Sequence, residues 1–285
     1  MRQRAVSSIG VVAIGLVPAL LGGWVFAVVF TAITLVAYHE AIAITLPKAT
    51  PLKHIGTAIV ALAGLLSALD TPSNAFALIA VLAVGIPLVG AVFWKETLAM
   101  EQWTATTATT LYLALPVYAA IDLRNSVDHP SDDWIGSMAG VLPGVSDATG
   151  GGLAWFLLAI FITWLSDTFA YLVGKTWGTH KLIPRVSPNK TIEGALGGLA
   201  ASAITAVICD QVFGMEIGPA PSIVIGLALG GIGQLGDLSE SMLKRMRGVK
   251  DSGNLIPGHG GMLDRIDALI FAIVAAWLIA PFVSI

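Results

Sequence analysis

Acidic side chains lie within or at the ends of apolar segments in the second half of the chain. They are Asp167, Asp237, Glu240, Asp264 and Asp267. An ionised side chain inside a membrane helix costs at least about 2.5 kcal/mol on insertion scales. Each of these residues is therefore expected to pair with a cation, to bind a metal ion or to face water.

The spacing of these acids predicts which of them act together, because residues three and four apart share one face of a helix. Asp237 shares a stripe with Ser241 and Lys244, and Asp264 shares a face of the next helix with Asp267. Two helices that each present carboxylates form a site for a hard cation, since Mg²⁺ takes a few carboxylate oxygens together with substrate phosphates. The spacing leaves a second interpretation open, in which the acids only pair with neighbouring lysines and arginines.

The loop between these two helices, "KDSGNLIPGHGG" (250–261), favours phosphate binding. Its glycines let backbone N–H groups approach a ligand closely, and it leads into a helix N-terminus, which attracts anions. His259 either donates a hydrogen bond to phosphate or is an ordinary solvated loop residue, and spacing leaves both open. The basic residues that flank the loop are Lys244, Arg245, Lys250 and Arg265.

The elements that carry these residues are membrane helices. The chain of 285 residues is 56% hydrophobic and only 12% charged, with a mean hydropathy of +0.83, whereas soluble domains are about one quarter charged. The net charge of −3 gives no indication of a nucleic-acid partner. The single cysteine, Cys209, excludes an internal disulfide and is expected to be a buried structural thiol.

A spanning helix needs about 20 apolar residues, and this rule predicts an all-α, polytopic fold with about nine transmembrane helices. A turn at Gly22-Gly23 is expected to separate the first two spans. With the N-terminus inside, 14 of the 15 basic residues fall on one face and only Arg124 on the other. The positive-inside rule then places the N-terminus in the cytoplasm and the C-terminus outside. The predicted spans lie near 5–21, 24–46, 53–69, 75–94, 98–121, 153–173, 192–213, 222–243 and 263–283.

Three parts of the chain follow from these spans. Residues 1–121 form about five N-terminal helices, and residues 122–152 form an external loop, either a solvated connector or one with a short interfacial helix around Trp134. Residues 153–285 form the C-terminal helices that carry the polar site. Their cytoplasmic loops are 174–191 and 244–262, so the polar residues gather at the cytoplasmic side of the membrane rather than at its midplane, where a transporter would need them.

Two stretches resemble the phosphatidate cytidylyltransferase (CDP-diacylglycerol synthase) family. The first is 236–267, with "GDLSES", "KDSG", "PGHGG" and "DRID", and the second is 166–194, with "SDTFAY" and "SPNKTIEG". Together they cover about the C-terminal 120 residues. Phe169 and Asn189 depart from the residues that are common at these positions of the family, and the departures concern substrate fit rather than reaction type.

The resemblance implies a membrane enzyme that converts CTP and phosphatidate to CDP-diacylglycerol and pyrophosphate. It implies that Asp237, Asp264 and Asp267 hold Mg²⁺ and, with Lys244, are catalytic. It also implies phosphate or substrate contacts for a further set, in which Asp167 and Glu240 orient groups or serve a second, monovalent cation such as K⁺. The members of this set are Asp167, Lys190, Glu240, Arg245, His259 and Arg265.

Other functions stay open at this point. A CTP-dependent lipid kinase of the dolichol or prenol type would use a similar site but transfer the γ-phosphate, although the full "PGHGG…DRID" run favours the cytidylyltransferase. A CDP-archaeol-type synthase would differ only in taking a diether lipid acid. The expected location is the cytoplasmic membrane, and the sequence leaves acyl-chain preference and a homodimer open.

Overall fold

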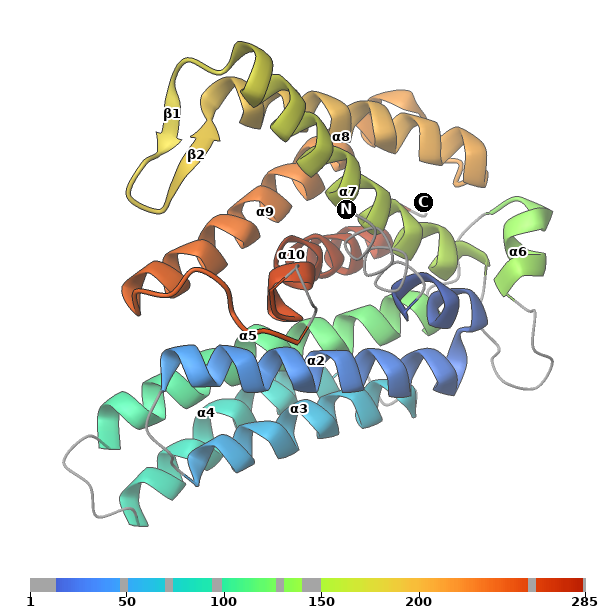
Figure 1. The fold of residues 1–285 in the computed structure, drawn as a ribbon. Coiled ribbons are helices and arrows are strands. Elements are labelled where there is room, and N and C mark those ends of the chain that lie inside the picture. Colours follow the sequence, from blue (N-terminus) through green and yellow to red (C-terminus); the bar gives the residue numbers. More distant parts are fainter. Residues whose placement is uncertain are drawn as a thin grey trace.

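The computed structural model describes residues 14–46, 51–69, 74–93, 99–126, 131–139, 150–255 and 260–283. Within these ranges the fold consists of helices and one two-stranded hairpin (Figure 1). Residues 14–21 are helical. The further elements are α2 (Gly23–Thr45), α3 (Leu52–Ala68), α4 (Ala75–Phe93), α5 (Ala99–Ser126), α6 (Asp133–Ala139), α7 (Gly150–Trp177), β1 (Lys181–Ile183), β2 (Ser187–Thr191), α8 (Ile192–Phe213), α9 (Pro219–Met246), α10 (Leu263–Ile279) and η1 (Ala280–Phe282).

The predicted class, an all-α polytopic membrane protein, is confirmed. Six helices within the described residues are long and apolar enough to cross a membrane: α2, α4, α7, α8, α9, and α10 with η1. Helix α3 is apolar but has only 17 residues, and α5 has 28 residues but begins with a threonine-rich stretch that is only mildly apolar. The count of nine spans and the sides of the two termini remain predictions, and residues 5–13 of the first span lie outside the described residues.

The helices form two groups that α10 joins (Figure 1). Helices α2, α3 and α4 pack around α5, whereas α8 packs against both α7 and α9. Helix α10 contacts α5, α7 and α9. Edge-to-face aromatic contacts also link the groups, since the ring centroid of Phe156 in α7 lies 4.9 Å from that of Phe26 and 6.1 Å from that of Phe30 in α2.

The outer faces of several helices are apolar. Large hydrophobic side chains are exposed there, among them Val81, Val92 and Phe93 of α4, Ile204 and Ile208 of α8, and Val224 and Leu235 of α9. A soluble protein seldom exposes apolar patches of this extent. These faces are therefore the surfaces that contact lipid.

The predicted turn between the first two spans is confirmed at Gly22-Gly23, where both residues have positive φ, 65° and 53°. Glycine adopts this conformation without a steric penalty. The end of α5 fixes the turn: Asn125 Oδ1 accepts a hydrogen bond from Gly23 N at 3.0 Å, and Arg124 Nε donates to the Ala19 carbonyl at 2.5 Å. Arg124 is thus buried against a helix end.

Two further expectations can be compared with the structure. Cys209 is buried and free, as predicted. Within the predicted loop 122–152, α5 continues to Ser126 and α7 already begins at Gly150. The short helix around Trp134 is present as α6, and the indole N–H of Trp134 donates to the Val212 carbonyl at 3.2 Å.

Candidate active site

A hairpin that the sequence did not predict carries one of the site's lysines. Strands β1 and β2 pair antiparallel between α7 and α8. Thr191 ends the hairpin and caps α8, its side-chain oxygen accepting from Gly194 N at 3.1 Å. A Cβ atom at Gly194 would lie 2.6 Å from the Ala170 carbonyl of α7. Glycine therefore permits the close approach of α7 and α8 that directs the hairpin, and with it Lys190, toward α9.

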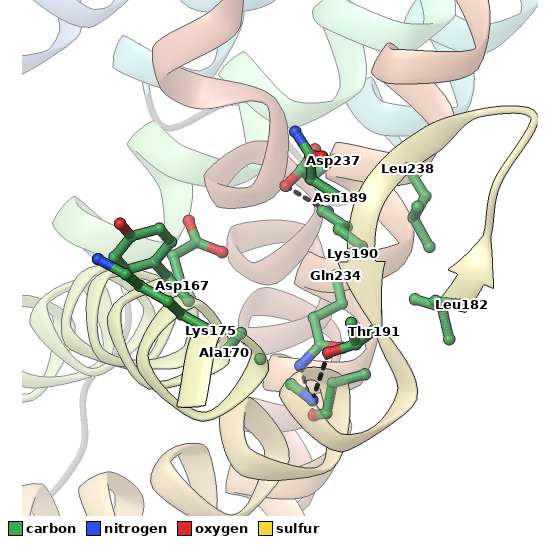
Figure 2. Close-up of a pocket in the computed structure, with 14 residues that line it drawn as sticks. Asp167, Ala170, Lys175, Leu182, Asn189, Lys190, Thr191, Gln234, Asp237 and Leu238 are labelled. Atoms are coloured by element: carbon green, nitrogen blue, oxygen red, sulfur yellow. Dashed lines mark hydrogen bonds and ion pairs between the residues drawn. The ribbon is translucent and has the colours of Figure 1, made fainter. Parts of the chain in front are cut away.

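A cavity of about 550 Å³ lies between α7, the hairpin, α8 and α9. Lys190 Nζ forms an ion pair with Asp237 Oδ2 at 2.5 Å, and Asp167 of α7 lines the same cavity (Figure 2). The two predicted sequence stretches therefore meet here. The remaining lining residues are Ala170, Tyr171, Gly174, Lys175, Leu182, Asn189, Thr191, Gly194, Ala195, Gln234 and Leu238.

A second charged cluster is centred on Lys244 of α9. Its Nζ forms an ion pair with Glu240, one turn earlier, and another with Asp264 Oδ1 of α10 at 2.6 Å. All three side chains are largely buried, with Glu240 only 1% exposed. Asp264 also accepts hydrogen bonds from Ser252 N at 3.0 Å and from Gly261 N at 2.8 Å. Both of its oxygens are therefore engaged by protein donors.

Asp267 joins the two clusters. Its carboxyl group interacts electrostatically with those of Asp237 and Asp167 on one side and with Lys244 on the other. A Cβ atom at Gly236 would lie 2.8 Å from the Asp267 carbonyl oxygen. The glycine thus lets α9 and α10 approach closely where each helix carries its carboxylate.

Two residues that sequence reasoning missed lie in or near this site. Lys175 lines the cavity and lies 5.6 Å from the centre of the Tyr171 ring. Tyr112 of α5 is near the acids, and its buried hydroxyl has no hydrogen-bond partner among the described residues. Lys175 lies inside the stretch 166–194 that resembles the family, which was a signal for the first residue, whereas an isolated tyrosine in a helix gave none for the second.

Two arginines that were predicted to bind substrate, Arg245 and Arg265, do not line the cavity. Arg245 instead donates to the carbonyl of Val186 in the hairpin turn at 3.3 Å and to that of Val249 at 3.2 Å. Arg265 is exposed on α10 and does not line the cavity. His259 lies outside the described residues. Arg245 therefore holds the hairpin against α9, which is a role the spacing did not predict.

The donor set fits Mg²⁺ in part. Within the described ranges, no group of three histidine, cysteine, aspartate or glutamate side chains is arranged to hold a metal ion by itself. Mg²⁺, however, is usually bound by one or two carboxylates together with substrate phosphates and water. Asp237 and Asp267 would supply such carboxylates, whereas Asp264 is occupied by Lys244 and backbone N–H groups.

Fold and site together define the class: a polytopic helical membrane protein with lysines and carboxylates around a cavity at the junction of its helices. The sequence profile described as "Cytidylyltransferase family" matches residues 2–283. The chain therefore belongs to the cytidylyltransferase family.

Part of the chain is also similar to curated phosphatidate cytidylyltransferases. It is 51% identical to that of Staphylococcus aureus over 124 residues, 47% to that of Staphylococcus saprophyticus over 122 residues and 45% to that of Staphylococcus epidermidis over 122 residues. Each match covers 43% of this chain and 47% of the relative. The chain thus spans about half the length of the curated relatives it matches.

Proposed function

We propose that this protein transfers the cytidylyl group of CTP to phosphatidate, giving CDP-diacylglycerol and pyrophosphate. The observation that carries the proposal is the charged cavity, in which Lys190 of the hairpin pairs with Asp237 of α9 opposite Asp167 of α7. A water-soluble nucleotide and a lipid head group are both anionic, so they need such a site at the edge of a membrane bundle. The named relatives support the same activity.

The reaction needs no strong protein base. The second pKa of a phosphate monoester is about 6, so the lipid phosphate is largely dianionic at neutral pH. One of its oxygens attacks the α-phosphorus of CTP, a new P–O bond forms, and the bond to the β-phosphate oxygen breaks as pyrophosphate leaves with the electron pair. What the protein supplies is alignment of two polyanions and compensation of the charge on the leaving group.

The residues divide into three roles in this proposal. Lys190, Lys175 and Lys244 supply positive charge for phosphate groups, and His259 stays a predicted phosphate ligand. Asp237 and Asp267 would hold Mg²⁺, which stabilises negative charge on the departing phosphates when it is bound. Asp167 would orient the bound groups or serve a second cation such as K⁺.

The proposed reaction predicts which phosphorus of CTP is transferred. With phosphatidate and Mg²⁺, label at the α-phosphate of CTP is expected to enter the lipid phase with release of pyrophosphate, whereas γ-label is expected to stay in the aqueous phase. Diacylglycerol should not react, because it lacks the nucleophilic phosphate. Thin-layer chromatography of extracted lipid measures both results.

Two outcomes would contradict this reaction. Entry of γ-label, or efficient use of diacylglycerol or a prenol, would indicate a lipid kinase. Absence of transfer from CTP to any phosphatidate or diether lipid acid would remove the enzymatic assignment itself. Protein boiled before the assay serves as the control for label that is carried over into the lipid extract.

We further propose that the protein lies in the cytoplasmic membrane with the site facing the cytoplasm, because 14 of its 15 basic residues fall on one predicted side. In a Cys209→Ala background, His180→Cys should react with a membrane-impermeant maleimide only after the cells are permeabilised, so that the reagent reaches the cytoplasmic face of the membrane. Asp133→Cys should react in intact cells. Both positions are exposed. The reverse labelling pattern would overturn the orientation and the access of CTP to the site.

A further inference from the structure

Glu40, near the end of α2, contacts the segment that leads from α9 into α10. Its Oε1 accepts a hydrogen bond from Met262 N at 3.0 Å. Its Oε2 accepts from Leu263 N at 2.8 Å and from the Ser252 hydroxyl at 3.2 Å. Figure 1 shows the part of this segment that directly follows α9 lying beside α2. A single carboxylate from the N-terminal half therefore has three donors in the C-terminal half.

These contacts fix the beginning of α10. The first N–H groups of a helix have no partner within the helix, and the N-cap residue of α10, Met262, has no side-chain cap hydrogen bond. The Glu40 carboxylate accepts two of these N–H groups. Its negative charge also interacts favourably with the positive end of the helix dipole. Glu40 thus caps α10 although it lies 222 positions before Met262 in the chain.

The same segment holds Asp264. Ser252 donates its hydroxyl to Glu40 and its backbone N–H to Asp264, and Asp264 pairs with Lys244. The segment can approach Glu40 because it contains glycine there: a Cβ atom at Gly253 would lie 2.6 Å from Glu40 Oε1. A continuous set of polar contacts therefore runs from α2 to the charged cluster of α9 and α10.

We infer that Glu40 is a positioning residue for the proposed cytidylyl transfer. It fixes the segment around Ser252 and the first turn of α10, and thereby sets the positions of Asp264 and Lys244. It acts through these residues and does not line the cavity. The inference rests on the proposed function for its effect on turnover, but the hold on the segment is a property of the protein without substrates.

The test uses Glu40→Gln in the full-length, purified protein. Glutamine has nearly the same shape, but its amide nitrogen would face an N–H donor where the carboxylate accepts, so at least one contact is lost. We expect kcat to fall at least tenfold. We also expect the Mg²⁺ concentration for half-maximal rate to rise, because Asp267, a proposed Mg²⁺ ligand, lies on the helix whose beginning Glu40 fixes. We also expect faster amide hydrogen exchange at 250–255 and 260–264 in the absence of substrates, with exchange in α8 unchanged.

Two comparison variants separate positioning from general destabilisation. Glu101→Gln removes an exposed carboxylate whose contact with Arg247 is long, 3.9 Å, and it should leave rate and exchange unchanged. Ser252→Ala removes one contact from the same set, so its effect on kcat should be smaller than that of Glu40→Gln and should not add to it in the double variant. If Glu40→Gln does not fold, Glu40→Asp, which withdraws the carboxylate by one methylene, takes its place.

The outcomes distinguish this inference from the proposed function. Faster exchange confined to the two segments, with slowed transfer, supports the inference. Wild-type transfer and wild-type exchange in Glu40→Gln overturn it, as does slowed transfer with faster exchange throughout the protein. If the wild-type protein itself transfers no cytidylyl group, the proposed function fails. Amide hydrogen exchange in Glu40→Gln then tests the hold of Glu40 on the segment by itself. Unchanged exchange rejects this role, and faster exchange confined to the two segments supports it.

Discussion

Replacing Asp237 by asparagine is expected to lower kcat/KM for cytidylyl transfer at least about 100-fold, the loss typical when one group that stabilises transition-state charge is removed. Asp237 lines the cavity and pairs with Lys190 at 2.5 Å. Asparagine keeps the size and one acceptor oxygen, so the helix and its packing should persist. The negative charge that would bind Mg²⁺ is lost, and the measurement is initial rate with α-labelled CTP over a range of Mg²⁺ concentrations.

A charge-matched variant controls for the loss of one acid. Asp133→Asn removes an exposed carboxylate in the first turn of α6, and α6 lies beside the end of α7 that is remote from the β1/β2 hairpin (Figure 1). It should keep the wild-type rate. The Asp237→Asn protein must insert into the membrane and elute as a monodisperse species before its rate is interpreted. A rate within threefold of wild type would then remove Asp237 from the proposed site.

Lys244→Met is expected to lower the free energy of unfolding by about 3–5 kcal/mol, because removal of one partner leaves buried charges without compensation. Lys244 lies between Glu240 and Asp264, whose side chains are only 1% and 8% exposed. Methionine preserves most of the volume but leaves two carboxylates together in a helix bundle. Unfolding in mixed micelles, followed by circular dichroism, gives the change in stability.

The double variant Glu240→Gln/Lys244→Met separates stability from chemistry. It removes the carboxylate that is more deeply buried, so a large part of the lost stability should return. Transfer activity should stay low, because the lysine proposed to supply positive charge for phosphate groups is still absent. Equal stability of the single and double variants would contradict the charge-compensation argument, and recovered activity would contradict a role of Lys244 in phosphate binding.

The helices were predictable from the sequence because each depends on a local property, a run of apolar residues long enough to span a bilayer. The predicted segment 192–213 has the bounds of α8, and 75–94 differs from α4 by one residue at its end. The turn at Gly22-Gly23 was equally local, since a double glycine interrupts an overlong apolar run. The charged residues of the site were also recognisable, because ionisable groups are rare in such segments.

Only the tertiary structure decided which of these residues meet. Lys190 reaches Asp237 through a hairpin that the sequence did not indicate, and Glu40 contacts Leu263 across 223 positions. In a membrane, the pattern of apolar residues says little about which helices are neighbours, because lipid is as apolar as the helices. Close packing at small residues determines which helices pack together. Gly194 and Gly236 set such approaches here. The sequence by itself therefore determined that this is a helical membrane protein with a charged site. The packing of its helices determined that Lys190 and Asp237 meet in the cavity wall and that Arg245, predicted to bind phosphate, contacts the hairpin.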